Sequence, residues 1–232
     1  MKIAVMQPYL FPYIGYFQLI GAVEKFIIFD NVNFINKGWI NRNRILLDGK
    51  EYLFTLSLEK ASQNKLINQI NVLENHKHKE EFLKLIYHAY CKTSEYDRVY
   101  PLIHEIVNNK ETNLSRFIEI GLRRIAEFLD LDTSFLCASQ IENDGSLKGR
   151  DKIMAICKRL NADEYINPIG GTELYDKDEF LRKGIRLSFL KTKDIVYPQF
   201  KNDFVPNLSI IDVLMFNPKA KIKDFLDDFE LV

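Results

Sequence analysis

The stretch that decides the fold is residues 2–29, KIAVMQPYLFPYIGYFQLIGAVEKFIIF, in which two short apolar runs flank a helical pattern. Residues 2–6 predict a buried strand, because the run is brief, apolar and soon followed by a proline. Residues 7–13 hold two prolines, which interrupt helices and strand ladders, and predict a loop. Residues 14–24 predict a helix and residues 26–29 a second buried strand. This order indicates a βαβ unit with parallel pairing.

The rest of the chain extends the same alternation. Asp48-Gly49 between apolar segments predicts a β-hairpin over residues 45–58. Ser209 before an apolar run, with Asp212 three residues later, predicts a final helix with a capping box. Further helices are expected at 76–90, 99–108, 113–130, 150–160 and 176–183, and further strands at 164–166 and 185–190. The sequence therefore predicts one α/β domain over residues 1–232, with a parallel sheet centred on strand 2–6 and a helical insertion at about 75–131.

Composition excludes several classes of function. The chain carries 32 Lys and Arg against 32 Asp and Glu, so it lacks the basic footprint of a general nucleic-acid or acidic-membrane binder. Its three cysteines form no CxxC pair and its histidines no HExxH pattern, so no metal site is predicted. No signal-peptide pattern or apolar run long enough for a membrane span is present, which favours a cytoplasmic protein without membrane insertion.

The first loop leads to a helix start that favours an anion. Gly15 removes the side chain nearest the first backbone N–H groups, where the helix dipole attracts phosphate. The spacing around Gly15 resembles the HxGH loop of the nucleotidylyltransferase-like fold, with Tyr13 and Tyr16 in the two histidine positions. Tyrosine donates a hydrogen bond but stays neutral at pH 7. The resemblance implies a Rossmann-like sheet, Tyr13 as a candidate catalytic residue, and a phosphate-binding role for Gln7, Tyr9, Gly15 and Tyr16. The alternative is that these aromatic residues only pack the core.

Two polar groups follow this loop. Asp30 comes directly after strand 26–29, and is a candidate general base, ribose ligand or metal ligand, or else an aspartate that bonds to its own turn. The next group is Trp39, Arg42, Asn43 and Arg44. Guanidinium forks bind phosphate oxygens in pairs, and the only tryptophan can stack on a base or sugar. The alternative is a solvated basic loop. Because parallel pairing brings strand ends together, Gln7, Tyr13, Gly15, Asp30, Trp39, Arg42 and Arg44 are expected to converge on one pocket.

Two later segments are further candidates for anion binding. Lys148 and Arg150 precede or open the helix at 150–160, where cations are unfavourable unless an anion binds between them. Gly170 and Gly171 allow close backbone approach to a phosphate or carboxylate. A solvated loop and a tight turn are the respective alternatives.

Four segments, in this order along the chain, resemble the WbqC-like family. They are MQPYLFPYIGYFQLI at 6–20, GWINRNRI at 38–45, YINPIGGTELY at 165–175 and FVPNLSIIDVLMFN at 204–217. Proteins of this family are found among bacterial O-antigen and other surface-polysaccharide genes, including those of lipopolysaccharide. The resemblance therefore implies a pathway that uses nucleotide-linked sugars.

These observations together favour a transferase that acylates a nucleotide-linked aminosugar. Acyl-CoA is the expected donor, since two separated anion sites suit the pyrophosphates of a nucleotide-sugar and of CoA. Asp30 would take the proton from the attacking amine. A nucleotidylyltransferase-like enzyme and a non-catalytic nucleotide-sugar-binding partner are the alternatives. A homodimer is an open alternative to a monomer.

Overall fold

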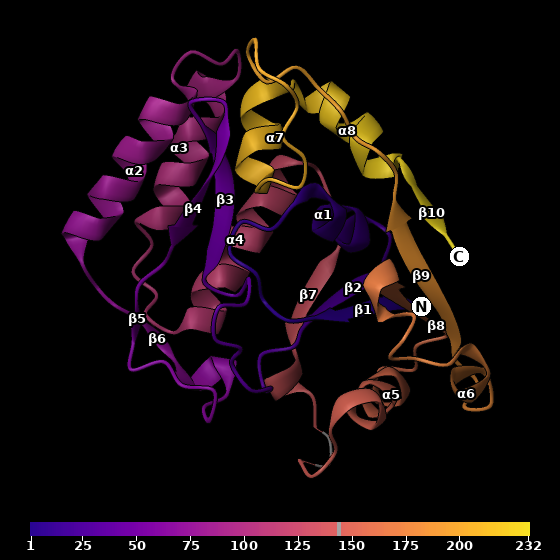
Figure 1. Cartoon of the computed structure of the whole chain (residues 1–232). Coiled ribbons are helices and arrows are strands. Elements are labelled where there is room, and N and C mark those ends of the chain that lie inside the picture. The colour runs from indigo at the N-terminus through magenta and orange to yellow at the C-terminus, as the bar shows by residue number, and fades with distance from the viewer. Residues whose placement is uncertain (143–144) are drawn as a thin grey trace.

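The computed structural model describes residues 1–142 and 145–232 and is built around a six-stranded sheet. The order across the sheet is β10-β9-β8-β1-β2-β7 (Figure 1). These strands are β1 (Lys2–Met6), β2 (Lys25–Ile28), β7 (Ser134–Cys137), β8 (Glu164–Pro168), β9 (Arg186–Thr192) and β10 (Phe229–Leu231). All neighbours pair in parallel except β10, which runs antiparallel to β9. The α/β fold class and the central position of the first strand are confirmed.

Both faces of the sheet are buried, which explains why its strands are continuous apolar runs. Along β1, Ala4 belongs to one core and its neighbours Ile3 and Val5 to another, because successive side chains point to opposite faces. The first core is covered by α1 (Ile14–Gly21), α4 (Leu114–Phe128), α7 (Ile210–Phe216) and α8 (Lys219–Asp227). The second is covered by α5 (Gly149–Arg159) and α6 (Lys177–Leu181). Figure 1 shows these two layers on opposite sides of the sheet.

The strand order creates a switch point between β1 and β8. The chain leaves β1 for α1 on one face and leaves β8 for α6 on the other. Their loops therefore diverge at the carboxyl edge, the place where open α/β sheets bind ligands.

The predicted hairpin is present as β3 (Arg42–Leu47) and β4 (Lys50–Thr55). Its turn residues Asp48 and Gly49 have φ of 51° and 74°, the left-handed pair that a two-residue hairpin turn requires. The structure differs from the expectation in that β3 already begins at Arg42, inside the stretch interpreted as a polar loop. From Arg42 to Ile45 every second residue is buried, and this period of two is that of a strand in spite of the polar composition.

The region of the helical insertion contains α2 (His76–Tyr90), α3 (Tyr96–Val107) and α4, close to the expected bounds. The segment before this region contains elements that the sequence does not predict: the two-residue strands β5 (Leu58–Glu59) and β6 (Asn71–Val72), and the 3-10 turn η1 (Ile67–Gln69). Two more 3-10 turns, η2 (Ala138–Gln140) and η3 (Ile169–Gly171), follow β7 and β8. Strands β7 and β10 and helix α8 are further elements that were not predicted.

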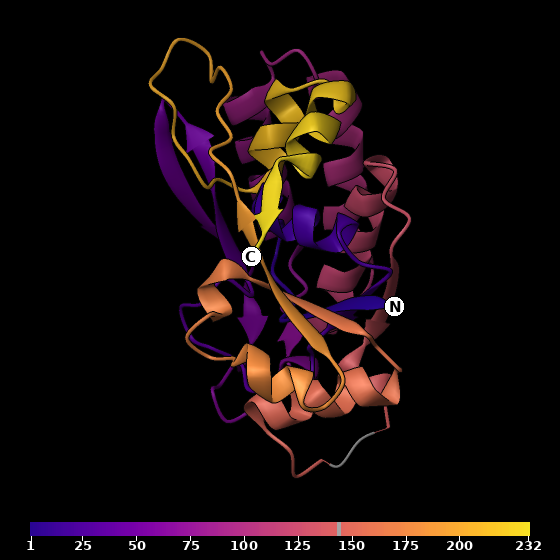
Figure 2. The same cartoon turned by 90° about the vertical axis from the view of Figure 1, so that its right-hand side faces the viewer.

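The last predicted helix is α7, and its capping differs from the prediction. Ser209 caps the helix by accepting a hydrogen bond from the Ile211 backbone N–H at 3.2 Å. Asp212 does not complete a capping box, since its carboxylate accepts bonds from Tyr90, Tyr197 and Gln199 instead. The segment between β9 and α7 stands beside the β3–β4 hairpin (Figure 2), where a side chain on Gly49 would collide with Asn202.

Candidate functional site

Two cavities meet in front of the start of α1. The first, here called the aromatic cleft, has a volume of about 360 Å³ and is lined by Tyr9, Pro12, Tyr13, Trp39, Asn43, Arg44 and Asn207. The adjoining cavity also measures about 360 Å³ and lies against Ile14, the segment 192–197 and residues 204–208. Tyr13 and Asn207 line both cavities, so the two cavities are direct neighbours.

The loop after β1 is held in place from two sides. Phe11 has a φ of 44°, a left-handed conformation that a bulky residue keeps only when its surroundings impose it. Asn43 Nδ2 donates to the carbonyls of Leu10 at 3.1 Å and Phe11 at 2.7 Å. Ser209 Oγ donates to the same Phe11 carbonyl at 2.8 Å, and the Ile210 N–H donates to Pro12 at 2.8 Å. Three segments that are distant in sequence therefore shape one wall of the cleft.

Trp39 and Arg44 form the opposite wall. The guanidinium carbon of Arg44 lies 5.0 Å from the centre of the Trp39 ring, within cation–π range. Arg44 also pairs with Glu51 at 2.6 Å, while its Nε is buried without a partner among the described residues. Arg42 lies 5.7 Å from the same ring, but its guanidinium donates to the backbone carbonyls of Lys37 and Gly38 and does not line the cleft.

The two tyrosines of the HxGH-like spacing occupy different environments. Tyr13 precedes the first turn of α1 and is 37% exposed, with its ring over Gly15, where a Cβ would collide with it. Burial raises the pKa of Tyr13, and a hydrogen bond with Thr192 opposes this. Tyr16 is fully buried and donates to the Gln7 carbonyl at 2.8 Å, and burial raises its pKa well above the usual value. Tyr13 therefore lines the cleft, whereas Tyr16 lies beneath the loop.

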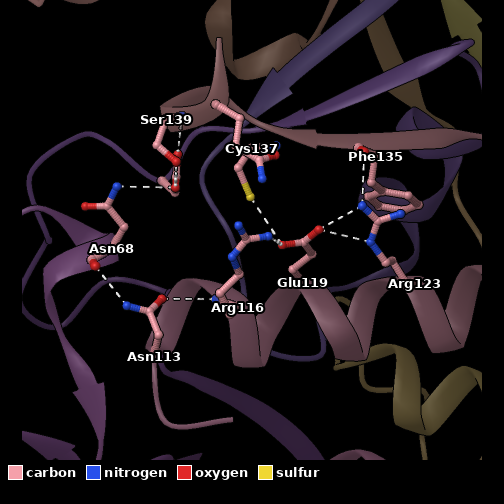
Figure 3. A network of polar contacts seen from close by, with 10 residues as sticks. Asn68, Asn113, Arg116, Glu119, Arg123, Phe135, Cys137 and Ser139 are labelled. Carbon is pink, nitrogen blue, oxygen red and sulfur yellow. Dashed lines mark hydrogen bonds and ion pairs between the residues drawn. The ribbon is translucent and has the colours of Figure 1, made fainter.

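Asp30 does not join this cleft. It is 3% exposed, and its carboxylate accepts bonds from the Ser139 N–H at 2.9 Å, the Ser139 hydroxyl at 2.5 Å and Asn68 Nδ2 at 3.3 Å. Figure 3 shows Asn68 and Ser139 converging on this point at the edge of the sheet. Both carboxylate oxygens are occupied, and η1 covers the position. The structure thus brings Tyr13, Trp39 and Arg44 together around the cleft, whereas Asp30 and Arg42 are not among its lining residues, although Arg42 lies against the Trp39 ring.

A second buried carboxylate, Glu119 on α4, belongs to the polar network that Figure 3 shows together with Asn68 and Ser139. It accepts bonds from Arg116 at 2.9 Å, Arg123 at 2.8 Å and the Cys137 thiol at 3.2 Å. Burial raises the pKa of Glu119, but the bonds from Arg123, Cys137 and Arg116 together outweigh it, so the pKa lies below its usual value. Burial raises the pKa of the Cys137 thiol to about 12, which leaves it unreactive.

The other predicted anion sites lie on the α5 and α6 side of the sheet. Lys148 is the exposed residue before α5, and Arg150 in its first turn pairs with Glu179 at 3.0 Å. Gly171 packs against the Asn167 amide at the end of β8, and Gly170 has open space around it. None of these four residues lines the aromatic cleft.

Sequence reasoning missed Thr192, which ends β9 and lines the adjoining cavity. It did suggest that Asp212, with Asn207 and Ser209 before it, reaches back to the site, and Asn207 lines both cavities. Asp212 is fully buried, and its carboxylate accepts bonds from Tyr90 at 2.9 Å, Tyr197 at 2.7 Å and Gln199 at 2.7 Å. Burial raises its pKa more than these bonds lower it. This carboxylate anchors the segment between β9 and α7 that forms the far wall of the adjoining cavity.

The sequence model of the WbqC-like protein family matches residues 7–224, so the chain belongs to this family. The chain is also similar to the uncharacterized protein Rv1507c of Mycobacterium tuberculosis (strain ATCC 25618 / H37Rv). The two are 28% identical over 231 residues, which is 97% of either chain. No solved structure matches the chain. Within the described residues, no helix has the length and apolarity needed to cross a bilayer.

Proposed function

We propose that this member of the WbqC-like family binds a nucleotide-linked sugar in the aromatic cleft and acylates it in the biosynthesis of a bacterial surface polysaccharide. The observation that carries the binding part is a cavity of about 360 Å³ lined at once by Trp39, Tyr13 and Arg44. The family resemblance supplies the pathway, since nucleotide-linked sugars are its building blocks.

The rings of the cleft suit the ring portions of such a ligand. Trp39 is 40% exposed and Tyr13 37% exposed, although large aromatic side chains are normally more buried. Their exposed faces lie on the same cavity and can stack on a base or on the C–H face of a sugar. Asn43, although part of the lining, is already engaged with the loop carbonyls and serves to position it.

The protein offers two groups that can bind the diphosphate of the ligand. Arg44 lines the cleft and keeps a buried Nε without a partner among the described residues. The N–H groups of Ile14 and Gly15 follow Tyr13 and precede the first bond of α1 by helix geometry, whereas the Tyr16 N–H already donates to the Tyr13 carbonyl at 3.1 Å. A guanidinium and a helix start together favour a phosphate dianion, through charge-assisted bonds and the helix dipole.

Acyl transfer is the finer part of the proposal. The sugar amine attacks the carbonyl carbon of an acyl-CoA thioester, a C–N bond forms, the C–S bond breaks, and the amine proton goes to a base while the thiolate leaves. Asp30, the base expected from the sequence, lies outside the cleft with both oxygens occupied. Asp194 is the carboxylate that lines the adjoining cavity. We therefore assign the proton to Asp194 in this scheme.

A nucleotidylyltransferase-like reaction is less well supported. It needs a cationic cradle for the α-phosphate at the loop, and this chain offers two neutral tyrosines there. The second of them, Tyr16, is fully buried and bonded to Gln7. Only Arg44 supplies positive charge in the aromatic cleft.

The fluorescence of Trp39, the only tryptophan of the chain, gives a direct test of binding. We expect a saturable change in its emission when dTDP- or UDP-linked aminosugars are titrated, and a Kd about ten- to a hundredfold higher in Arg44→Gln. Arg98→Gln is the matched control, because Arg98 lies at 5.2 Å over the Phe128 ring on another surface. Unchanged emission with every nucleotide-sugar, or wild-type affinity in Arg44→Gln, contradicts the proposal.

Acyl transfer is tested separately, by mass spectrometry of the sugar after incubation with acyl-CoA. The expected product is heavier by one acyl group, and Asp194→Asn is expected to slow its formation without changing the Kd for the sugar. If the sugar binds but is never acylated, the transferase part fails and the binding part stands.

A further inference from the structure

A buried lysine without an ion-pair partner lies at the carboxyl edge of the sheet, on the side covered by α5. Lys152 is 7% exposed, and its ammonium donates to the Asn31 carbonyl at 2.8 Å and lies 5.3 Å from the centre of the Phe29 ring. Within residues 1–142 and 145–232, no carboxylate lies within 4.0 Å of it. Lysine is almost never buried in this way, because an unpaired charge in the interior costs stability.

The neighbours of Lys152 do not neutralise its charge directly. Asp30 is the acidic group whose charge acts on it, but that carboxylate is engaged by Ser139 and Asn68. Asn31, which gives Lys152 its carbonyl, has a buried side-chain oxygen without a partner among the described residues. Among the described residues, Lys152 Nζ therefore has one hydrogen-bond acceptor for its three N–H groups and Asn31 Oδ1 has no donor, which leaves bonding capacity for a water or a ligand at this place.

The N-terminus of helix α5, the positive end of its dipole, lies on the same side as Lys152. Lys152 follows the first turn of this eleven-residue helix, and side chains on a helix lean toward its N-terminus. Lys148 stands at the N-cap position of α5, directly before the helix, and its side chain makes no capping hydrogen bond. The first backbone N–H groups of α5 therefore keep their capacity to bind an anion. Lys148, Gly149 and Arg150 are exposed, so solvent reaches this end of the helix.

We propose that Lys152, Asn31 and the N-terminus of α5 form a phosphate-binding site separate from the aromatic cleft. The phosphate would receive N–H bonds from Lys152 and from the first turn of α5, and Asn31 would accept a bond from a hydroxyl of the same ligand. The site uses none of the residues of the aromatic cleft, so it does not depend on the proposed function.

Inorganic phosphate is the probe, and thermal unfolding at neutral pH and constant ionic strength is the measurement. Wild-type protein is expected to gain about 3–6 °C in Tm at a phosphate concentration of roughly ten times Kd. Lys152→Met, which keeps the length of the side chain and removes the charge, is expected to lose this gain. Lys158→Met is the matched control, since Lys158 is exposed in the last turn of the same helix.

The behaviour of Lys152→Met without phosphate separates a binding role from a structural one. If Lys152 serves to bind a ligand, the Lys152→Met variant is expected to unfold at the same or a higher temperature than wild type, because the buried charge is gone and methionine needs no partner there. A large fall in Tm without phosphate would show that Lys152 supports the fold. An equal phosphate effect in Lys152→Met and wild type, or none in either, overturns the proposal.

Discussion

The loops after β1 and β2 leave neighbouring strands at the same edge of the sheet, yet one opens to solvent and the other is closed. After β1, residues 7–13 turn outward and present Tyr13 to a cavity. After β2, the chain pairs with residues 65–68 through the N–H groups of Phe34, Ile67 and Asn68. Asp30 is enclosed between that segment and Ser139.

The difference shows that a polar residue at the carboxyl edge is not thereby part of a binding site. The carbonyls of the first loop and the carboxylate of Asp30 in the second are both hydrogen-bonded, but with different partners. The first is bonded from behind by Asn43 and Ser209, which leaves its aromatic face free. The second is covered by η1, whose Asn68 donates a hydrogen bond to the Asp30 carboxylate. A ligand can therefore reach the loop after β1 but not the loop after β2, because η1 covers only the second.

The largest expected effect comes from removing the carboxylate of the closed loop. Asp30→Ala removes the buried acceptor of three hydrogen bonds, from the Ser139 N–H, the Ser139 hydroxyl and Asn68, and we expect a loss of about 2–4 kcal/mol in the free energy of unfolding. Urea denaturation measures it, with exposed Asp132→Ala as the control. Nucleotide-sugar affinity in the folded variant is expected to stay unchanged. A stable Asp30→Ala protein that no longer binds would instead place Asp30 in the site.

In the open loop, one substitution is expected to lower both the free energy of unfolding and the affinity for the ligand. Asn43→Ala removes the bonds to the carbonyls of Leu10 and Phe11, and we expect a loss of about 1–3 kcal/mol together with weaker binding in the cleft. Asn41→Ala is the matched control, because Asn41 makes one bond, to the Leu56 carbonyl at 2.8 Å, and none to the loop. Trp39 fluorescence titration reports the affinity. If both variants bind equally well, Asn43 does not hold the loop in its binding conformation.

The two regions are expected to respond differently to acid, because the pKa values of their buried carboxylates are shifted in opposite directions. The pKa of Glu119, beside the closed loop, is lowered, so its stabilisation is complete above its unfolded pKa of about 4.3 and is lost as the pH falls through the lower folded value. The pKa of Asp212, behind the open loop, is raised by burial. Its contribution therefore falls as the pH rises from about 3.9 through the folded value.

The corresponding variant is Glu119→Gln. We expect it to lose about 1–2 kcal/mol at pH 7, a moderate value because Arg116 and Arg123 are both more than 40% exposed. Urea denaturation between pH 7 and pH 3 should show the difference from wild type shrinking below about pH 4.3. A difference independent of pH would mean that Glu119 acts by packing rather than by charge.

The fold could be predicted further than the site, and particular residues show why. Strands 2–6 and 26–29 follow from local apolar runs, and the Asp48-Gly49 turn from the φ values it needs. The bond from Ser209 to Phe11 joins residues 198 positions apart, and no local pattern announces it. Asn68, which covers Asp30, lies in a segment without periodicity. Asp212 has the spacing of a capping box, but three buried donors from other elements compete for its carboxylate and prevail.

The smallest expected effect distinguishes the two arginines that flank Trp39. Sequence alone gives both the same role, whereas the structure places Arg44 in the cleft and turns Arg42 onto the carbonyls of Lys37 and Gly38. Arg44→Gln should therefore weaken nucleotide-sugar binding about ten- to a hundredfold, and Arg42→Gln only about two- to fivefold.

The residual effect of Arg42→Gln has a structural cause. Arg42 fixes the turn that carries Trp39 and lies against its ring, so its loss lets the indole move without removing a phosphate ligand. Stability should change by no more than about 0.5 kcal/mol, because the side chain lies on the surface. Salt provides the sharper criterion. Loss of a phosphate contact reduces the salt dependence of Kd, so that dependence should weaken in Arg44→Gln and remain wild-type in Arg42→Gln. Equal losses of affinity and of salt dependence in the two variants would mean that both arginines bind the phosphate, and that the turn carrying Trp39 rearranges when the ligand binds.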